Sequence, residues 1–174
     1  MIKSFSGKAL LGVSIRYGVI GGLVSVALLL VFYFLGRNPL VDIRIVDIVV
    51  LAIFVFFALK ELRDRYMEGK LHYWQGLTAG IATYLVIALI SAISILILTG
   101  LIDTEMTQRY IDSRIELLET NRQTLVETID EEAYREALSG VKKTTPLYLA
   151  LDDFLKKSIM GLFVTIIIAV ILRR

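Results

Sequence analysis

The chain has 174 residues, of which 56% are hydrophobic, and its formal net charge is +2. Ordinary soluble domains are about 45–50% apolar, so this chain carries more apolar residues than one soluble core of its size can hide. The small net charge gives no indication of nucleic-acid binding. The absence of cysteine excludes disulfides and thiolate chemistry, and a single histidine, His72, excludes a site built from several histidines.

The apolar residues fall in four blocks, and we expect each block to form a transmembrane helix. The first, "YGVIGGLVSVALLLVFYFL", and the third, "YWQGLTAGIATYLVIALISAISILILTGLI", contain no charged residue and come close to or exceed the about 20 residues that cross a bilayer. The second, "IVVLAIFVFFAL", and the fourth, "SIMGLFVTIIIAVIL", are shorter and need flanking residues whose charges reach the headgroups. The predicted spans are roughly 14–35, 43–61, 73–101 and 155–172.

Two alternatives to four spans remain open. The first block follows a basic segment, as the apolar part of a secretory signal peptide does, but it is longer than usual and no small-residue cleavage site follows it. The second and fourth blocks are short enough to be helices that are buried in the protein and do not cross the membrane. Strands are disfavoured because the blocks are continuous apolar runs without the alternation of a transmembrane barrel. The expected fold is therefore an all-α membrane protein and a single domain, 1–174.

Lys and Arg on the short connections predict the orientation. With four spans, the N-terminal segment, the second connection and the C-terminal tail lie on one side and together carry nine Lys and Arg residues, against two in the first connection. Positive charges in short loops favour the cytoplasm. We therefore expect both termini to be cytoplasmic and residues 103–145, a polar insert between spans three and four, to be extracytoplasmic.

The insert has helical periodicity in its apolar residues, so it predicts two amphipathic helices that meet between Asn121 and Thr128. "TIDE", beginning at Thr128, matches a capping box and would start the second helix, which would end near Gly140. The last helix is then expected to run from Pro146, preceded by a capping Thr145, to Leu172.

Small residues recur every four positions in two of the apolar blocks, at Ser14, Gly18 and Gly22 and again at Gly76 and Gly80. Small residues let helices approach closely in lipid. Packing within one chain is the simpler interpretation, and contact with a second copy is the alternative.

The stretch "LALDDFLKKS" places acid before base at helical spacing, Asp152 with Lys156 and Asp153 with Lys157. Pairs of this kind stabilise a helix by about 0.2–0.5 kcal/mol each. We interpret them as ion pairs that lie at the membrane border rather than as catalytic or metal-binding carboxylates.

Asp47 lies just inside the second block, and acids within membrane spans are functional candidates by default. Arg44 precedes it by three residues on the same face, so we expect an ion pair at headgroup depth. Other polar residues that could line a path are few and form no series: Ser25, Gln75, Thr83, Ser91 and Ser94.

Three parts of the sequence together resemble a family: "ALKELRDRYMEGKLHYWQGLTAGI", the acidic helical insert, and "TPLYLALDDFLKKSIMGLFVTIIIAVILRR". They are similar to the small bacterial membrane family known as domain of unknown function 4199. The resemblance covers nearly the whole chain and implies a four-span protein of the inner membrane. It implies no activity, cofactor or catalytic residue.

From these observations we expect a multi-pass protein of the bacterial inner membrane that is not an enzyme, with no catalytic residues, no cofactor and no metal site. A scaffold or accessory subunit is the first interpretation, and a small oligomeric transporter or channel is the alternative. Expected partners are the lipid bilayer and either a second copy of the chain or another membrane protein, but not nucleic acid. The sequence leaves open whether Asp47, Asp152 or Asp153 has a functional role.

Overall fold

The computed structural model describes residues 7–36, 40 and 44–173, except for the side chains of residues 44 and 45. These residues are almost entirely helical and contain no strand. Within the described residues, the structure gives the bounds of six α-helices and two short π-helical segments: α1 (Gly7–Phe34), α3 (Arg44–Glu61), η1 (Leu62–Tyr66), α4 (Tyr73–Ile97), η2 (Leu98–Ile102), α5 (Glu105–Thr120), α6 (Arg122–Lys142) and α7 (Pro146–Leu172).

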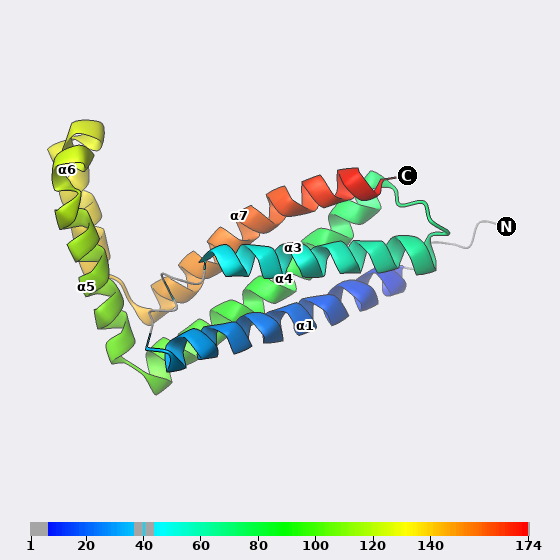
Figure 1. Cartoon of the computed structure of the whole chain (residues 1–174), viewed down its shortest axis with the longest axis horizontal. Coiled ribbons are helices and arrows are strands. Elements are labelled where there is room, and N and C mark those ends of the chain that lie inside the picture. The colour runs from blue at the N-terminus through cyan, green and yellow to red at the C-terminus, as the bar shows by residue number, and fades with distance from the viewer. Residues whose placement is uncertain (1–6, 37–39, 41–43, 174) are drawn as a thin grey trace.

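Four long helices, α1, α3, α4 and α7, lie side by side and form an elongated bundle (Figure 1). α4 packs against each of the other three, so it is the central helix. The described ends of the chain, at the start of α1 and the end of α7, lie at one end of the bundle. α5 and α6 lie at the opposite end and are turned away from the bundle axis.

Small residues allow α1 and α7 to approach α4 closely, and their contacts lie within one chain. A methyl group placed on Gly18 would lie 2.6 Å from Val86 Cβ, and one placed on Gly80 would lie 2.3 Å from Thr165 Cγ2. The Ser14 hydroxyl donates to the carbonyl oxygen of Ala79 at 3.0 Å. The intramolecular interpretation of the small-residue rows is therefore confirmed for these contacts.

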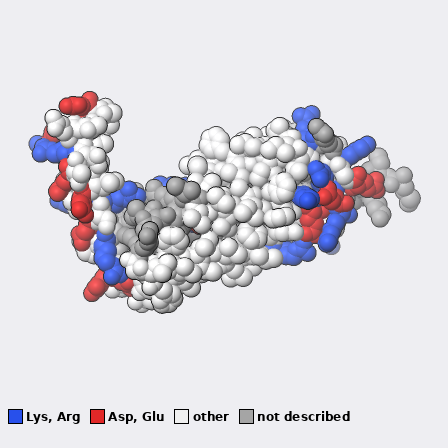
Figure 2. Space-filling model, viewed as in Figure 1, with Lys and Arg blue, Asp and Glu red and all other residues white. Residues whose placement is uncertain are grey.

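Three of the described helices have the length and composition to cross a membrane: Gly7–Phe34, Tyr73–Ile102 and Pro146–Leu172. α3 is not among them, because its 18 residues include four charged ones, Arg44, Asp47, Lys60 and Glu61. Figure 2 shows the charged side chains gathered at the two ends of the molecule, with a nearly uncharged band between them. This distribution is the one expected of a protein whose middle faces lipid.

α5 and α6 form a hairpin that meets at Asn121, as the periodicity predicts. The predicted cap at Thr128 is wrong, because the Thr128 hydroxyl donates to the Thr124 carbonyl instead. The kink lies at Asp130 (φ 69°, ψ 169°), whose Oδ1 accepts the N–H of Ala133 at 2.9 Å. The aspartate side chain caps the following turn, although this backbone conformation is a strained one that is adopted almost only by glycine. α6 then continues past Gly140 to Lys142.

Glu131, next to the kink, joins the two segments of α6. Its Oε1 accepts from Arg135 at 3.2 Å and from Arg122 at 3.1 Å. The hydrogen bond from Arg135 is the main cause that lowers the pKa of the Glu131 carboxyl below its ordinary value of 4.5; burial opposes it, and the hydrogen bond from Arg122 adds to the lowering. The turn of the hairpin is thus fastened by charged groups in water.

The start of α7 agrees with the prediction. Thr145 is its N-cap, since its hydroxyl accepts the N–H of Tyr148 at 3.2 Å, and Pro146 occupies the first turn. The helix ends at Leu172. It therefore extends from the base of the hairpin to the opposite end of the bundle as one continuous element (Figure 1).

Candidate functional site: a buried ion cluster beside a cavity

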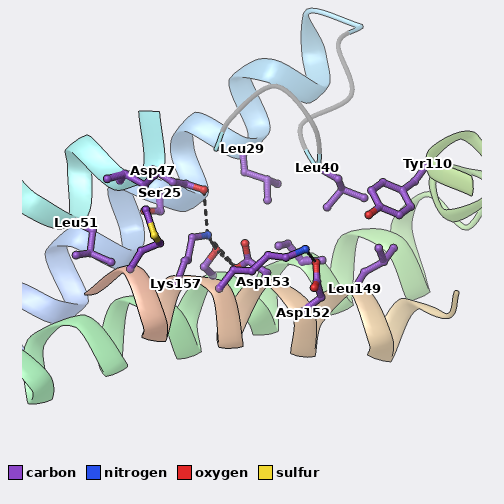
Figure 3. A pocket seen from close by; sticks show the side chains of 15 residues that line it. Ser25, Leu29, Leu40, Asp47, Leu51, Tyr110, Leu149, Asp152, Asp153 and Lys157 are labelled. Carbon is purple, nitrogen blue, oxygen red and sulfur yellow. Dashed lines mark hydrogen bonds and ion pairs between the residues drawn. The ribbon is translucent and has the colours of Figure 1, made fainter. Parts of the chain in front are cut away.

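A cavity of 270 Å³ lies between the four long helices, toward the end of the bundle that carries the hairpin. Figure 3 shows its labelled lining residues, which come from α1, α3, α5 and α7 and from the connection after α1. The volume is slightly below the about 300–1,000 Å³ of typical small-molecule pockets. The lining combines apolar side chains with a group of charged and hydroxyl side chains: Ser25, Asp47, Ser91, Asp152, Asp153, Lys156 and Lys157.

The cavity lies beside the first turns of α3, where Asp47, Ile48 and Leu51 line it. Leu40, in the connection before α3, and Tyr110 of α5 line the cavity there. The apolar core is correspondingly divided into two clusters, and Leu51 of one and Leu29 of the other both line the cavity.

Lys157 is the centre of the charged group. Its ammonium lies 3.0 Å from Asp47 Oδ2 on α3 and 2.9 Å from Asp153 Oδ2 on its own helix, and it also donates to the Ser91 hydroxyl of α4. The Lys157 side chain is only 10% exposed and that of Asp47 only 9%. Figure 3 shows Asp47 and Lys157 pointing toward each other from opposite walls.

These contacts lie well inside the bundle. From Pro146 to Lys157, α7 rises about 16 Å, at about 1.5 Å per residue. A buried ion pair is stable only if its geometry and additional hydrogen bonds offset the loss of water. Here Ser91 supplies such a bond to Asp153 at 3.0 Å as well as receiving one from Lys157.

Asp47 Oδ1 and the Ser25 hydroxyl oxygen, both on the cavity wall, form no hydrogen bond of normal geometry among the described residues. Both residues are more than nine-tenths buried. The Ser25 hydroxyl nevertheless lies close enough to the Asp47 carboxylate to interact with it. Both oxygens retain lone pairs that a bound polar group could use.

Asp47 forms an ion pair, as expected, but with a different cation. Its carboxylate is buried between helices, and Lys157 of α7 supplies the positive charge. The side chain of Arg44, the expected partner, lies outside the described residues. Helical spacing places Arg44 near Asp47 only along α3, whereas the cation found here comes from a helix more than a hundred residues away in sequence.

The two predicted pairs on α7 both form, but they differ. Lys156 contacts Asp152 with 48% of its side chain exposed, as a border pair would. Lys157 contacts Asp153 and is buried, so the border interpretation does not describe it. The difference arises because adjacent residues on a helix point about 100° apart, so one pair faces outward and the other faces α3 and α4.

Of the other polar candidates, some line the cavity and others do not. Ser25 and Ser91 line the cavity with Asp47. Thr83 and Ser94 instead donate to the carbonyl oxygens of their own helix, at 2.8 Å each. The helix-terminal residue Gln75 accepts the N–H of His72 at 3.3 Å, at the opposite end of the bundle.

A second buried acid, Glu61, was not singled out from the sequence. Its side chain is 9% exposed and accepts from Tyr17 at 2.7 Å, from Arg16, and from Arg65 at 3.4 Å. These contacts connect α1 to the end of α3 and to η1. The charged segment after α3 is therefore partly structural rather than a fully solvated loop, and Gly69 in its turn has the positive φ of 83° that glycine allows.

The polar groups beside the cavity are held in one cluster. Each acid that contacts Lys157 is held by that cation, and the Ser91 hydroxyl is bonded to both Lys157 and Asp153. Within the described part of the chain, no group of three or more His, Asp or Glu side chains could hold a metal ion. What the site offers is one uncompensated carboxylate oxygen, hydroxyl groups and apolar walls.

The fold and the site define an all-helical protein with apolar helices of membrane-spanning length. The family model of DUF4199, described as a protein of unknown function, matches residues 16–174, so the chain belongs to this family. Comparisons with curated proteins and with solved structures find no match.

Proposed function

We propose that this protein is a four-span protein of the bacterial inner membrane that binds a small solute in the cavity beside Lys157. The observation that carries the proposal is the buried contact of Lys157 with Asp47, Asp153 and Ser91 next to unfilled space. Ionisable groups held inside a membrane bundle are energetically costly and are found mainly on substrate or ion pathways. We therefore favour solute binding by a small transporter over a purely structural role.

The fourth span in this proposal is α3. Its 18 residues rise about 27 Å, close to the about 30 Å of a bilayer core. Two of the four charges that exclude it by composition lie in ion pairs, since Asp47 contacts Lys157, and Glu61 contacts Arg16 and Arg65. The basic residues near the two described termini and η1 favour a cytoplasmic location for that end of the bundle, with the α5–α6 hairpin outside.

Single cysteines in this cysteine-free chain test the four-span topology. In intact spheroplasts, an impermeant thiol reagent should label Leu35→Cys and Thr120→Cys, which lie at the hairpin end, but not Glu68→Cys. Labelling of Glu68→Cys after the membrane is opened provides the control. If Glu68→Cys reacts in intact spheroplasts and Thr120→Cys does not, the orientation is reversed. If Leu35→Cys and Glu68→Cys react from the same side, α3 does not span.

A pair of bulky substitutions tests solute binding. Met160 lines the cavity, whereas its neighbour Ile159 does not line it and is 57% exposed on the bundle surface. Native mass spectrometry of the protein in lipid nanodiscs should detect a small bound solute in the wild type and in Ile159→Trp. Met160→Trp should lose it because the indole fills the cavity. Equal occupancy in both variants would place the solute elsewhere and contradict the proposal.

The hairpin favours a second candidate, the scaffold or accessory subunit. It stands away from the bundle (Figure 1), and it leaves Leu117 and Ile129 substantially exposed. Affinity purification in mild detergent compares the wild type with Leu117→Ser plus Ile129→Ser. A stoichiometric protein that is retained by the wild type and lost from the variant would support this role. Recovery of only the chain itself, as a defined oligomer, would support the transporter.

A further inference from the structure

The charges of the described residues that line the cavity do not cancel. Three carboxylates line it, Asp47, Asp152 and Asp153, against two ammonium groups, Lys156 and Lys157. Lys156 forms an ion pair with Asp152, and Lys157 forms ion pairs with both Asp47 and Asp153. The lining residues therefore carry one negative charge in excess. Such an excess attracts a single positive charge.

Two oxygens on the cavity wall show where that charge would be held. Asp47 contacts Lys157 through Oδ2, whereas its Oδ1 and the Ser25 hydroxyl, which interacts with the same carboxylate, form no hydrogen bond of normal geometry among the described residues. Figure 3 shows Ser25 beside Asp47 on the same side of the cavity. A carboxylate oxygen and a neighbouring hydroxyl oxygen are two acceptors for one N–H-bearing cation.

The rest of the wall determines the kind of cation. Bare metal cations of the hard type take six or more oxygen ligands, which this site does not present in its described residues. Most of the remaining lining is apolar, from Leu29, Leu51, Ile95 and Leu149. Such walls suit an apolar body attached to a charged head, because burial of the body removes apolar surface from water.

Resting on the proposed solute-binding function, we infer that the cavity binds a small organic ammonium ion. Its N–H groups donate to Asp47 Oδ1 and to the Ser25 hydroxyl, and its hydrocarbon part lies against the apolar wall. Lys157 stays in place and holds the other oxygen of Asp47, so it orients the carboxylate. The ion supplies the positive charge that the lining residues lack.

Isothermal titration of the full-length protein in nanodiscs tests this inference with three probes of equal length: n-butylammonium chloride, butanol and sodium butyrate. Only butylammonium should bind saturably. Asp47→Asn should weaken its binding at least tenfold, because hydrogen bonds to a charged group are the strong ones. Ser25→Ala, which disturbs no ion pair, should weaken it about fivefold. Glu119→Gln, which changes an exposed acid of α5 that does not line the cavity, should bind within about twofold of the wild type.

The other outcomes separate two kinds of failure. Tighter binding of butyrate than of butylammonium would show that the lysines select an anion; the solute-binding function would stand and the ammonium class would be wrong. If sodium chloride competes with butylammonium at equal concentration, the cavity binds an inorganic cation; the solute-binding function would again stand and the ammonium class would be wrong. If none of the probes binds, the inference is overturned, and the native mass spectrometry of Met160→Trp decides separately whether the solute-binding function fails with it.

Discussion

Replacing Lys157 by methionine should destabilise the folded protein far more than the same change at Lys156. Both lysines lie on α7, one residue apart, and each follows an aspartate at i+4 spacing. Methionine keeps most of the side-chain volume and removes the charge. The two variants therefore compare a buried ammonium with an exposed one at nearly constant packing.

The expected size of the effect follows from what each change leaves behind. Lys157→Met leaves the carboxylates of Asp47 and Asp153 without their shared cation, and Asp47 is only 8% exposed. Removing one partner of a buried ion pair costs about 3–5 kcal/mol, which shifts the unfolding equilibrium roughly 100- to 4,000-fold. Lys156 is 48% exposed, and loss of an exposed pair costs about 0.2–1 kcal/mol.

Reversible unfolding in lipid, measured by steric trapping, provides the free energies. Lys157→Met combined with Asp47→Asn and Asp153→Asn should recover most of the loss, because neutral amides no longer need the cation. A loss for Lys157→Met no greater than that for Lys156→Met would refute the reasoning. It would show that Lys157 reaches the headgroups, as the sequence alone predicts.

Three further predictions concern packing, capping and pH. Gly80→Ala should destabilise the protein by about 1–3 kcal/mol through overpacking. Adding Thr165→Ala should restore most of this stability, because only the Cβ of residue 165, 3.1 Å from the new methyl group, remains. Steric trapping measures the stability of both variants, and no restoration would contradict the close contact between α4 and α7. Thr145→Ala should cost about 1 kcal/mol by removing the cap of α7, and unchanged stability would contradict that cap. Because the folded-state pKa of Glu131 is lowered, the contribution of Glu131 to hairpin stability should be complete above pH 4.5, the ordinary pKa, and lost as pH falls through the folded-state pKa. NMR titration of the Glu131 carboxyl measures this pKa, and a midpoint at or above 4.5 would contradict the prediction.

The elements themselves could be predicted from the sequence because their signals are local. Apolar runs define the long helices, and Thr145 followed by Pro146 fixes the start of α7 at the observed residue. The rows of small residues correctly indicate close helix contacts, since a methyl group on Gly18 or Gly80 would collide with the neighbouring helix. The capping box at Thr128 failed because Asp130, two residues later, adopts a backbone conformation that no propensity rule anticipates.

The site could be predicted only in part, because it depends on the relative rotation of helices that are distant in sequence. Asp47 was recognised as unusual, but its partner lies on α7 and not one turn away on α3. Spacing along α7 shows that Asp153 and Lys157 can pair, yet it does not show which of two adjacent pairs faces the interior. One signal was available in the sequence. Asp47 immediately precedes the uncharged run of the second block, and Lys157 immediately precedes that of the fourth, so an ion pair between them would compensate the two charges.

The most direct test of a solvent-filled binding cavity is the reactivity of two adjacent cysteines in the membrane. Met160 lines the cavity and Ile159 does not, although both are substantially exposed. A small, water-soluble and impermeant thiol reagent, added from the extracytoplasmic side, should label Met160→Cys and leave Ile159→Cys unlabelled, because only the cavity offers the water in which a thiolate forms. If neither position reacts, or if Ile159→Cys reacts as fast as Met160→Cys, no water-filled cavity opens beside Lys157 on that side and the central claim is wrong.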